Sequence, residues 1–248
     1  MEFIKASKTF YLNKSTYVNL RWIAIIGQLI TIFFVQFFLN FKFNYFPCIF
    51  IISLSVLTNF YLQFRFKENQ LNNFFSTVYL SFDILLLGIL FFLTGGITNP
   101  FIFLIIVPAV FSSQYLNIYS SIILVSLIIL ILSILTFYYI DLPHPSELHF
   151  HAPDYYLFAI PISIIIGLLF LVYFGVKFGE ENRTRKNAYD KIQELMAKEN
   201  ELISLGAQSA AAAHSLGTPL STILLTIKEL QKESGTNVKI KKDLDLLL

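Results

Sequence analysis

Long apolar runs separated by short polar stretches occupy the first three quarters of the chain. A helix that crosses a hydrocarbon layer of about 30 Å needs about 20 apolar residues, and five of the runs approach or exceed that length. The fourth run is shorter, and we expect it to cross at a slant or with help from its neighbours. The pattern therefore predicts a bundle of six membrane-spanning helices, at residues 18–39, 46–63, 75–93, 101–116, 119–140 and 156–178.

After residue 178 the sequence becomes abruptly charged. Apolar residues then recur at alternating spacings of four and three, with Glu199 interrupting the series, which is typical of a short parallel coiled coil. A merely amphipathic surface helix is the alternative. The residues that form this apolar seam are Ala188, Ile192, Leu195 and Leu202.

The C-terminal residues predict two further helices. An apolar face continues through Leu220 and Ile227 to about Lys232, residues 233–237 form a loop, and residues 238–248 begin a second helix. Two such helices per chain would pair in a homodimer as a four-helix bundle. The expected organisation is all-α: a tail at 1–17, a membrane domain at 18–178, a coiled-coil linker at 179–204 and a partial dimerisation hairpin at 205–248.

The composition supports a membrane protein in contact with lipid, because 56% of the residues are hydrophobic and only 14% are charged. The net charge of +2 gives no indication of a nucleic-acid partner. Lysine and arginine cluster on one side of the predicted spans, so we expect both termini in the cytoplasm of a bacterium and a multi-pass protein of its inner membrane. The residues on that side are Lys5, Lys8, Lys14, Arg21, Arg65, Lys67, Lys177, Arg183, Arg185 and Lys186, against Lys42 on the other.

Few side chains in the membrane domain suggest chemistry. Cys48 is the only cysteine, so an intramolecular disulfide is excluded and a buried thiol is expected. The histidines of the fifth loop (His144, His149 and His151) lie among prolines that fix no coordination geometry, and we predict no metal site. Asp83 lies well inside a span, where acids usually mark function. A hydrogen-bonded carboxyl paired with Gln28 or Asn59 is an equally weighted alternative.

Residues 210–221 read AAAAHSLGTPLS. Alanine favours a slim helix, and His214 and Thr218 lie one turn apart on one face. Pro219 lacks an amide hydrogen and clashes with the carbonyl four residues earlier, so we expect a bend beside the histidine. An accessible imidazole with small neighbours is suited to accept a group from a bulky donor.

This segment resembles the phospho-accepting box of sensor histidine kinases, and in particular the redox-responsive RegB/PrrB branch. The resemblance implies autophosphorylation of His214 and transfer to the aspartate of a response-regulator receiver domain, with Thr218 orienting a water for dephosphorylation. Ser215 departs from the family, which has an acidic residue there to act as the base. No nucleotide-binding motif follows, so Mg-ATP would have to be supplied by a domain outside these residues.

A second stretch, residues 94–101 (TGGITNPF), predicts a tight turn between the third and fourth spans. It resembles the quinone-binding element of the same family at Gly95, Gly96, Asn99, Pro100 and Phe101, which implies a quinone ligand, with Asp83 as a further candidate. The glycines would let backbone amides approach a flat ligand. Alternatively, the stretch is a simple turn.

The sequence thus predicts a membrane sensor histidine kinase that senses redox state through a quinone and is phosphorylated on His214. The alternative is an impaired sensor that only dephosphorylates its partner or dimerises, because Ser215 replaces the acidic base. A six-span transporter or channel is disfavoured, since the spans contain no internal repeat and no series of paired charges.

Overall fold

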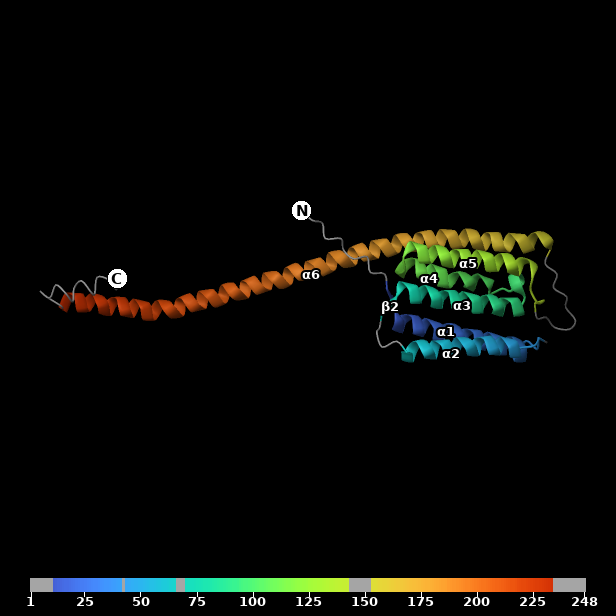
Figure 1. Ribbon diagram of the computed structural model, residues 1–248, viewed down its shortest axis with the longest axis horizontal. Coiled ribbons are helices and arrows are strands. Elements are labelled where there is room, and N and C mark those ends of the chain that lie inside the picture. Colours follow the sequence, from blue (N-terminus) through green and yellow to red (C-terminus); the bar gives the residue numbers. More distant parts are fainter. Residues whose placement is uncertain (1–10, 42, 66–69, 143–152, 234–248) are drawn as a thin grey trace. The chain divides into compact units, whose positions relative to one another are not determined.

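The computed structural model describes residues 11–41, 43–65, 70–142 and 153–233 (Figure 1). The predicted hairpin helix at 238–248, the histidines of the fifth loop, and Lys5, Lys8, Lys42 and Lys67 lie outside the described residues. The chain divides into two units, at 1–183 and 184–248, which are considered separately below.

The described residues are predominantly helical, so the all-α prediction is confirmed. Within the described part of the chain, five helices are long and apolar enough to cross a membrane, and the apolar segment Ile102–Tyr115 is shorter. These helices suggest a membrane-bound protein, while the count of six spans stays a prediction. The elements are β1 (Tyr11–Asn13), α1 (Lys14–Phe33), η1 (Phe34–Phe38), α2 (Phe46–Arg65), β2 (Gln70–Asn72), α3 (Asn73–Leu93), η2 (Gly96–Thr98), η3 (Ile102–Ile106), α4 (Val107–Tyr115), α5 (Ile118–Phe137) and α6 (Asp154–Glu233).

The first helix begins earlier than predicted. Asn13 caps α1 by accepting a hydrogen bond from the Thr16 amide at 3.3 Å, so the helix starts at Lys14 rather than at residue 18. Just before this cap, β1 pairs antiparallel with β2, a contact between segments about 60 residues apart that sequence periodicity did not reveal. The end of the tail predicted at 1–17 is therefore structured and holds the starts of α1 and α3 together.

The fourth apolar run is divided between two kinds of helix. Residues Ile102–Ile106 form a 3₁₀ helix, and the α-helix α4 begins at Val107, with Pro108 in its first turn, where a missing amide hydrogen is tolerated. The run ends at Leu116, and Asn117 caps α5 by accepting from the Ser120 amide at 2.8 Å. This segment is consequently shorter than its neighbours.

Two apolar clusters hold the first unit together. The larger cluster is built mainly from α3, α4 and α5, and it also contains residues of β1, α1, α2 and β2 and Leu168 of α6. The smaller joins α1 and α2 to Leu90 of α3 and contains Cys48, whose side chain is fully buried as predicted. At the α3–α5 contact Gly88 is buried, and a Cβ atom added there would lie 2.9 Å from Ile131 Cγ2. A glycine therefore lets these two helices approach closely.

Helix α6 contributes to both units. Its first part packs Leu157, Ile160 and Val172 against the larger cluster. A Cβ atom at Gly175 would collide with Ser113 Oγ, and one at Gly179 would lie 2.6 Å from the Gln114 carbonyl oxygen. These glycines let α6 pack against the end of α4. In the second unit the predicted seam residues Ile192, Leu195 and Leu202 are exposed, so the coiled coil stays a prediction.

The α3–α5 contact generates a test of the packing. We expect Gly88→Leu to lower the free energy of unfolding by about 1–3 kcal/mol, because the new side chain collides with Ile131. Thermal unfolding in lipid nanodiscs measures the effect. Gly27→Leu is the matched control, since a Cβ atom at Gly27 meets nothing within 4 Å. Equal stability of the two variants would contradict the close packing.

Candidate functional site

The predicted phospho-acceptor lies on the exposed surface of α6. His214 is exposed, and within the described part of the chain no hydrogen bond or ion pair involves its imidazole. Its neighbours on the same helix face, three and four residues apart, are mostly small. With His214 they line a shallow, open surface groove formed by Ala213, His214, Gly217, Thr218, Ser221, Thr222 and Leu225. A protein domain could approach the imidazole over this face.

The other three residues of the box occupy the same helix. Ser215 Oγ donates to the Ala212 carbonyl oxygen at 3.0 Å, a local bond that directs its proton toward the backbone. Thr218 lies in the groove beside His214, and its carbonyl oxygen accepts from Thr222 Oγ1 at 3.0 Å. The helix continues through Pro219, whose expected bend stays a prediction. The structure therefore brings His214 and Thr218 together on one face.

Between the membrane domain and His214, one acidic residue is clamped by two lysines. Lys191 and Lys198 each approach Glu194 to 2.9 Å. The hydrogen bonds from Lys198 and Lys191 lower the pKa of Glu194 to about 2. Because the pKa is depressed, the contribution of this clamp to helix stability is present at neutral pH and is lost as the pH falls through about 2. All three side chains are exposed, so the contribution is small.

The loop predicted to bind quinone has a backbone that requires glycine. Gly95 and Gly96 have φ angles of 112° and 55°, in the left-handed region. Both are buried by the chain that follows α5. A Cβ atom at Gly95 would lie 2.5 Å from Leu142 Cδ1, and one at Gly96 would collide with Tyr139. The space beside the glycines is thus filled by the protein's own side chains.

The remaining loop residues divide into an internal brace and an exposed edge. Asn99 is buried; its Nδ2 donates to the Thr94 carbonyl oxygen at 2.7 Å, and its Oδ1 accepts from the Phe101 amide at 2.8 Å. Pro100 and Phe101 are exposed. Asn99 therefore fixes the loop, whereas Pro100 and Phe101 form its accessible edge.

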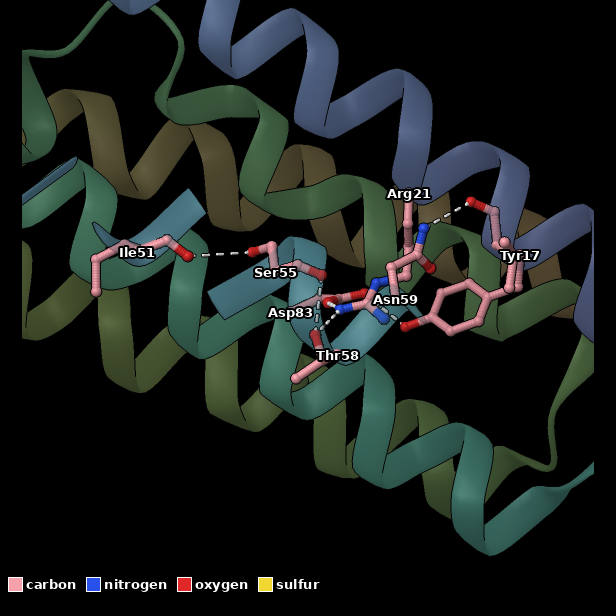
Figure 2. Close-up of polar contacts among 8 residues, drawn as sticks. Tyr17, Arg21, Ile51, Ser55, Thr58, Asn59 and Asp83 are labelled. Atoms are coloured by element: carbon pink, nitrogen blue, oxygen red, sulfur yellow. Dashed lines mark hydrogen bonds and ion pairs between the residues drawn. The ribbon is translucent and has the colours of Figure 1, made fainter. Parts of the chain in front are cut away.

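Asp83 takes part in a polar network that joins three helices (Figure 2). Its Oδ1 lies 2.8 Å from Arg21 Nη2 of α1, and its Oδ2 accepts from the Tyr17 hydroxyl at 2.5 Å. Arg21 Nη2 also donates to Thr58 Oγ1 of α2 at 2.7 Å. The predicted pairing of Asp83 with Gln28 or Asn59 was wrong, because the carboxylate has a cationic partner instead.

The pairing of Arg21 with Asp83 was not predicted from the sequence. Counted among the charges on the cytoplasmic side, Arg21 is 5% exposed and lies in the interior of α1. A signal was nevertheless present, since Tyr17 and Arg21 are four residues apart and share one helix face. The pairing with α3 depends on a tertiary contact that no spacing encodes.

The network predicts a large effect of removing one charge. We expect Asp83→Asn to lower the free energy of unfolding by about 3–5 kcal/mol, because Arg21 remains buried without its counter-charge. Thermal unfolding in nanodiscs measures this loss, and the double variant Arg21→Met with Asp83→Leu should recover most of it. Lys177→Ala, which breaks an ion pair between side chains 61% and 57% exposed, is the control and should change stability little. An Asp83→Asn variant as stable as this control would contradict a tightly coupled pair.

Comparison with known proteins found two curated sequences of sensor histidine kinase RegB from Cereibacter sphaeroides, one of them assigned to a particular strain. Each is 33% identical over 233 residues, which make up 94% of this chain and 50% of the relative. The chain thus spans about half the length of the curated relatives it matches. No family model and no solved structure matched. The comparison confirms the resemblance predicted from the two sequence motifs: the chain is related to the RegB-type sensor histidine kinases.

Proposed function

We propose that this chain is the sensing and phospho-accepting part of a redox-responsive sensor histidine kinase in a bacterial inner membrane. The observation that carries the proposal is the exposed His214, which shares a groove with Thr218 on the helix that continues from the last apolar segment. The relationship to RegB adds independent support. Quinone near Gly95–Phe101 would be the redox signal, and both termini would lie in the cytoplasm.

The proposed chemistry at His214 is a phosphoryl transfer. The imidazole Nε2 attacks the γ-phosphorus of Mg-ATP, a nitrogen–phosphorus bond forms, and ADP leaves with the electrons of the broken phosphorus–oxygen bond. The nucleotide would be held by a kinase domain outside these residues. The phosphoryl group would then pass to an aspartate of a response-regulator receiver domain, for which the small residues of the groove leave room.

The second candidate is a sensor that mainly dephosphorylates its response regulator. Ser215 stands beside His214 where an acidic base is expected, and its hydroxyl is uncharged and bonded to the Ala212 carbonyl. It therefore does not favour the imidazolium that forms during attack. Thr218 still lies in the groove, where it could orient a water molecule.

A chain of packing contacts offers a route from the loop to His214. The loop leads directly through η3 into α4, and the end of α4 contacts Gly175 and Gly179 of α6. A displacement of α4 would therefore act on the helix that carries His214. The exposed apolar side chains of the linker, including Leu195 and Leu202, suit pairing with a second copy, so we propose a homodimer.

The missing carboxylate predicts a gain on restoration. Supplied with a soluble histidine-kinase ATP domain and radiolabelled Mg-ATP, Ser215→Glu should incorporate acid-labile label faster than the native chain, by about a hundredfold if it restores general-base catalysis. Ser209→Glu places the same charge elsewhere on the exposed helix and should leave the rate unchanged.

His214→Gln abolishes labelling if His214 is the acceptor. Label that persists in this variant would reject the phospho-acceptor assignment. Labelling of the native chain at the rate of the Ser215→Glu variant would instead show that the serine is no defect and would remove the case for the second candidate.

The exposed edge of the loop predicts a specific loss of quinone response. The same assay is run with added short-chain quinone. Phe101→Ala should raise the quinone concentration that gives a half-maximal change in His214 labelling by about tenfold, because an aromatic contact of about 1–3 kcal/mol is removed. Phe103→Ala removes a similarly exposed ring two residues further along and is the matched control. Equal responses in the two variants would exclude Phe101 as a ligand contact.

A further inference from the structure

Three buried side-chain polar atoms have no hydrogen-bond partner among the described residues: Gln36 Oε1, Arg21 Nη1 and Asn59 Oδ1. The last two belong to the neighbouring helices α1 and α2. The side chains that carry them are deeply buried, with exposed fractions of 5% for Arg21 and 0% for Asn59. A buried polar atom left unpaired costs about 1–3 kcal/mol, more for a charged group, so each atom calls for an explanation.

Both atoms belong to the contact between α1 and α2. Arg21 Nη2 is bonded to Thr58 Oγ1 at 2.7 Å, and Asn59 is the next residue along α2. Asn59 Nδ2 donates to the carbonyl oxygen of Val18, one turn before Arg21, at 3.3 Å. Figure 2 shows these side chains converging with Tyr17 and Asp83. The guanidinium of Arg21 and the amide of Asn59 therefore lie at the same contact between α1 and α2. In each group one polar atom is hydrogen-bonded and another has no partner within the described part of the chain.

The free ends determine which chemical group fits. Arg21 Nη1 can only donate a hydrogen bond, and Asn59 Oδ1 can only accept one. A group that satisfies both must accept from the guanidinium and donate to the amide oxygen, as a hydroxyl does. A quinone carbonyl accepts but cannot donate. An anion is also unsuited, because Asp83 already balances the charge of Arg21 at 2.8 Å.

We propose that Arg21 Nη1 and Asn59 Oδ1 form a binding site for one hydroxyl group, supplied either by a buried water molecule or by a reduced quinone. If a hydroquinone is the source, the site distinguishes the reduced ligand from the oxidised one by its hydrogen bonding alone; this arm rests on the redox-sensing function proposed above. The site is separate from the loop at Gly95–Phe101, and it would link α1 and α2 to α3 through Asp83.

The single tryptophan of the chain supplies a reporter beside this site. Trp22 follows Arg21 directly and makes an edge contact with Phe60, which follows Asn59, at a ring-centroid distance of 5.1 Å. The carboxylate of Asp83 is 18% exposed, so the network is not fully sealed from the surroundings of the bundle. Occupation of the site should therefore change the fluorescence of Trp22.

The test is an anaerobic titration of the full chain in nanodiscs with a short-chain ubiquinol and, separately, the matching ubiquinone, followed by Trp22 fluorescence. If the ligand is a hydroquinone, the ubiquinol gives a saturable change at lower concentration than the ubiquinone. Asn59→Leu, and Arg21→Lys, which keeps the charge facing Asp83, should each weaken ubiquinol binding by about tenfold or more through the loss of one hydrogen bond. Asn19→Leu, at an exposed position of α1, should bind like the native chain.

A resident water is tested by water-edited solid-state NMR of the same samples. Rapid transfer of water magnetisation to the Arg21 guanidinium and the Asn59 amide, lost in Asn59→Leu, supports water as the source. If neither ubiquinol nor water is detected, or if the ubiquinone binds as tightly as the ubiquinol without any resident water, the proposal is overturned. His214 labelling that still responds to quinone would show that the sensing function survives this failure.

Discussion

The structure of the membrane domain depends on the cost of burying a charge where water is excluded. Arg21 and Asp83 satisfy that constraint by pairing at 2.8 Å. In addition, the Tyr17 hydroxyl donates to Asp83, and Arg21 donates to Thr58 Oγ1. Because these four residues come from α1, α2 and α3, the pairing fixes how the first two helices pack against the third. The antiparallel contact between β1 and β2 holds the starts of α1 and α3 together at one end of this arrangement.

The shape of the loop after α3 is set by packing and by internal hydrogen bonds. Gly95 and Gly96 are required by their backbone angles and by the side chains of Leu142 and Tyr139 packed on them. Asn99 braces the turn from within. These residues place Phe101 at the exposed edge, so a ligand that contacts Phe101 would act on a rigid loop whose continuation is α4.

Small residues also allow α4 to pack closely against α6. Gly175 and Gly179 allow α6 to approach Ser113 and Gln114 more closely than any side chain would permit. Within the second unit His214 is exposed. Helix α6 is continuous from Asp154 to Glu233 and so carries both the glycines packed on α4 and His214.

The sequence by itself determined the helical class and most helix bounds, because the length of an apolar run is a local property of the chain; the start of α1 at the Asn13 cap was an exception. It also determined that His214 and Thr218 share one face, since residues four apart on a helix lie on the same side. Tertiary structure alone decided that Arg21 is buried and that Asp83 pairs with it rather than with Asn59. It likewise decided that Tyr139 and Leu142 cover the glycines, and that Arg21 Nη1 and Asn59 Oδ1 have no hydrogen-bond partner among the described residues. These features arise from contacts between residues distant in sequence, and the spacing of residues along one helix carries no information about them.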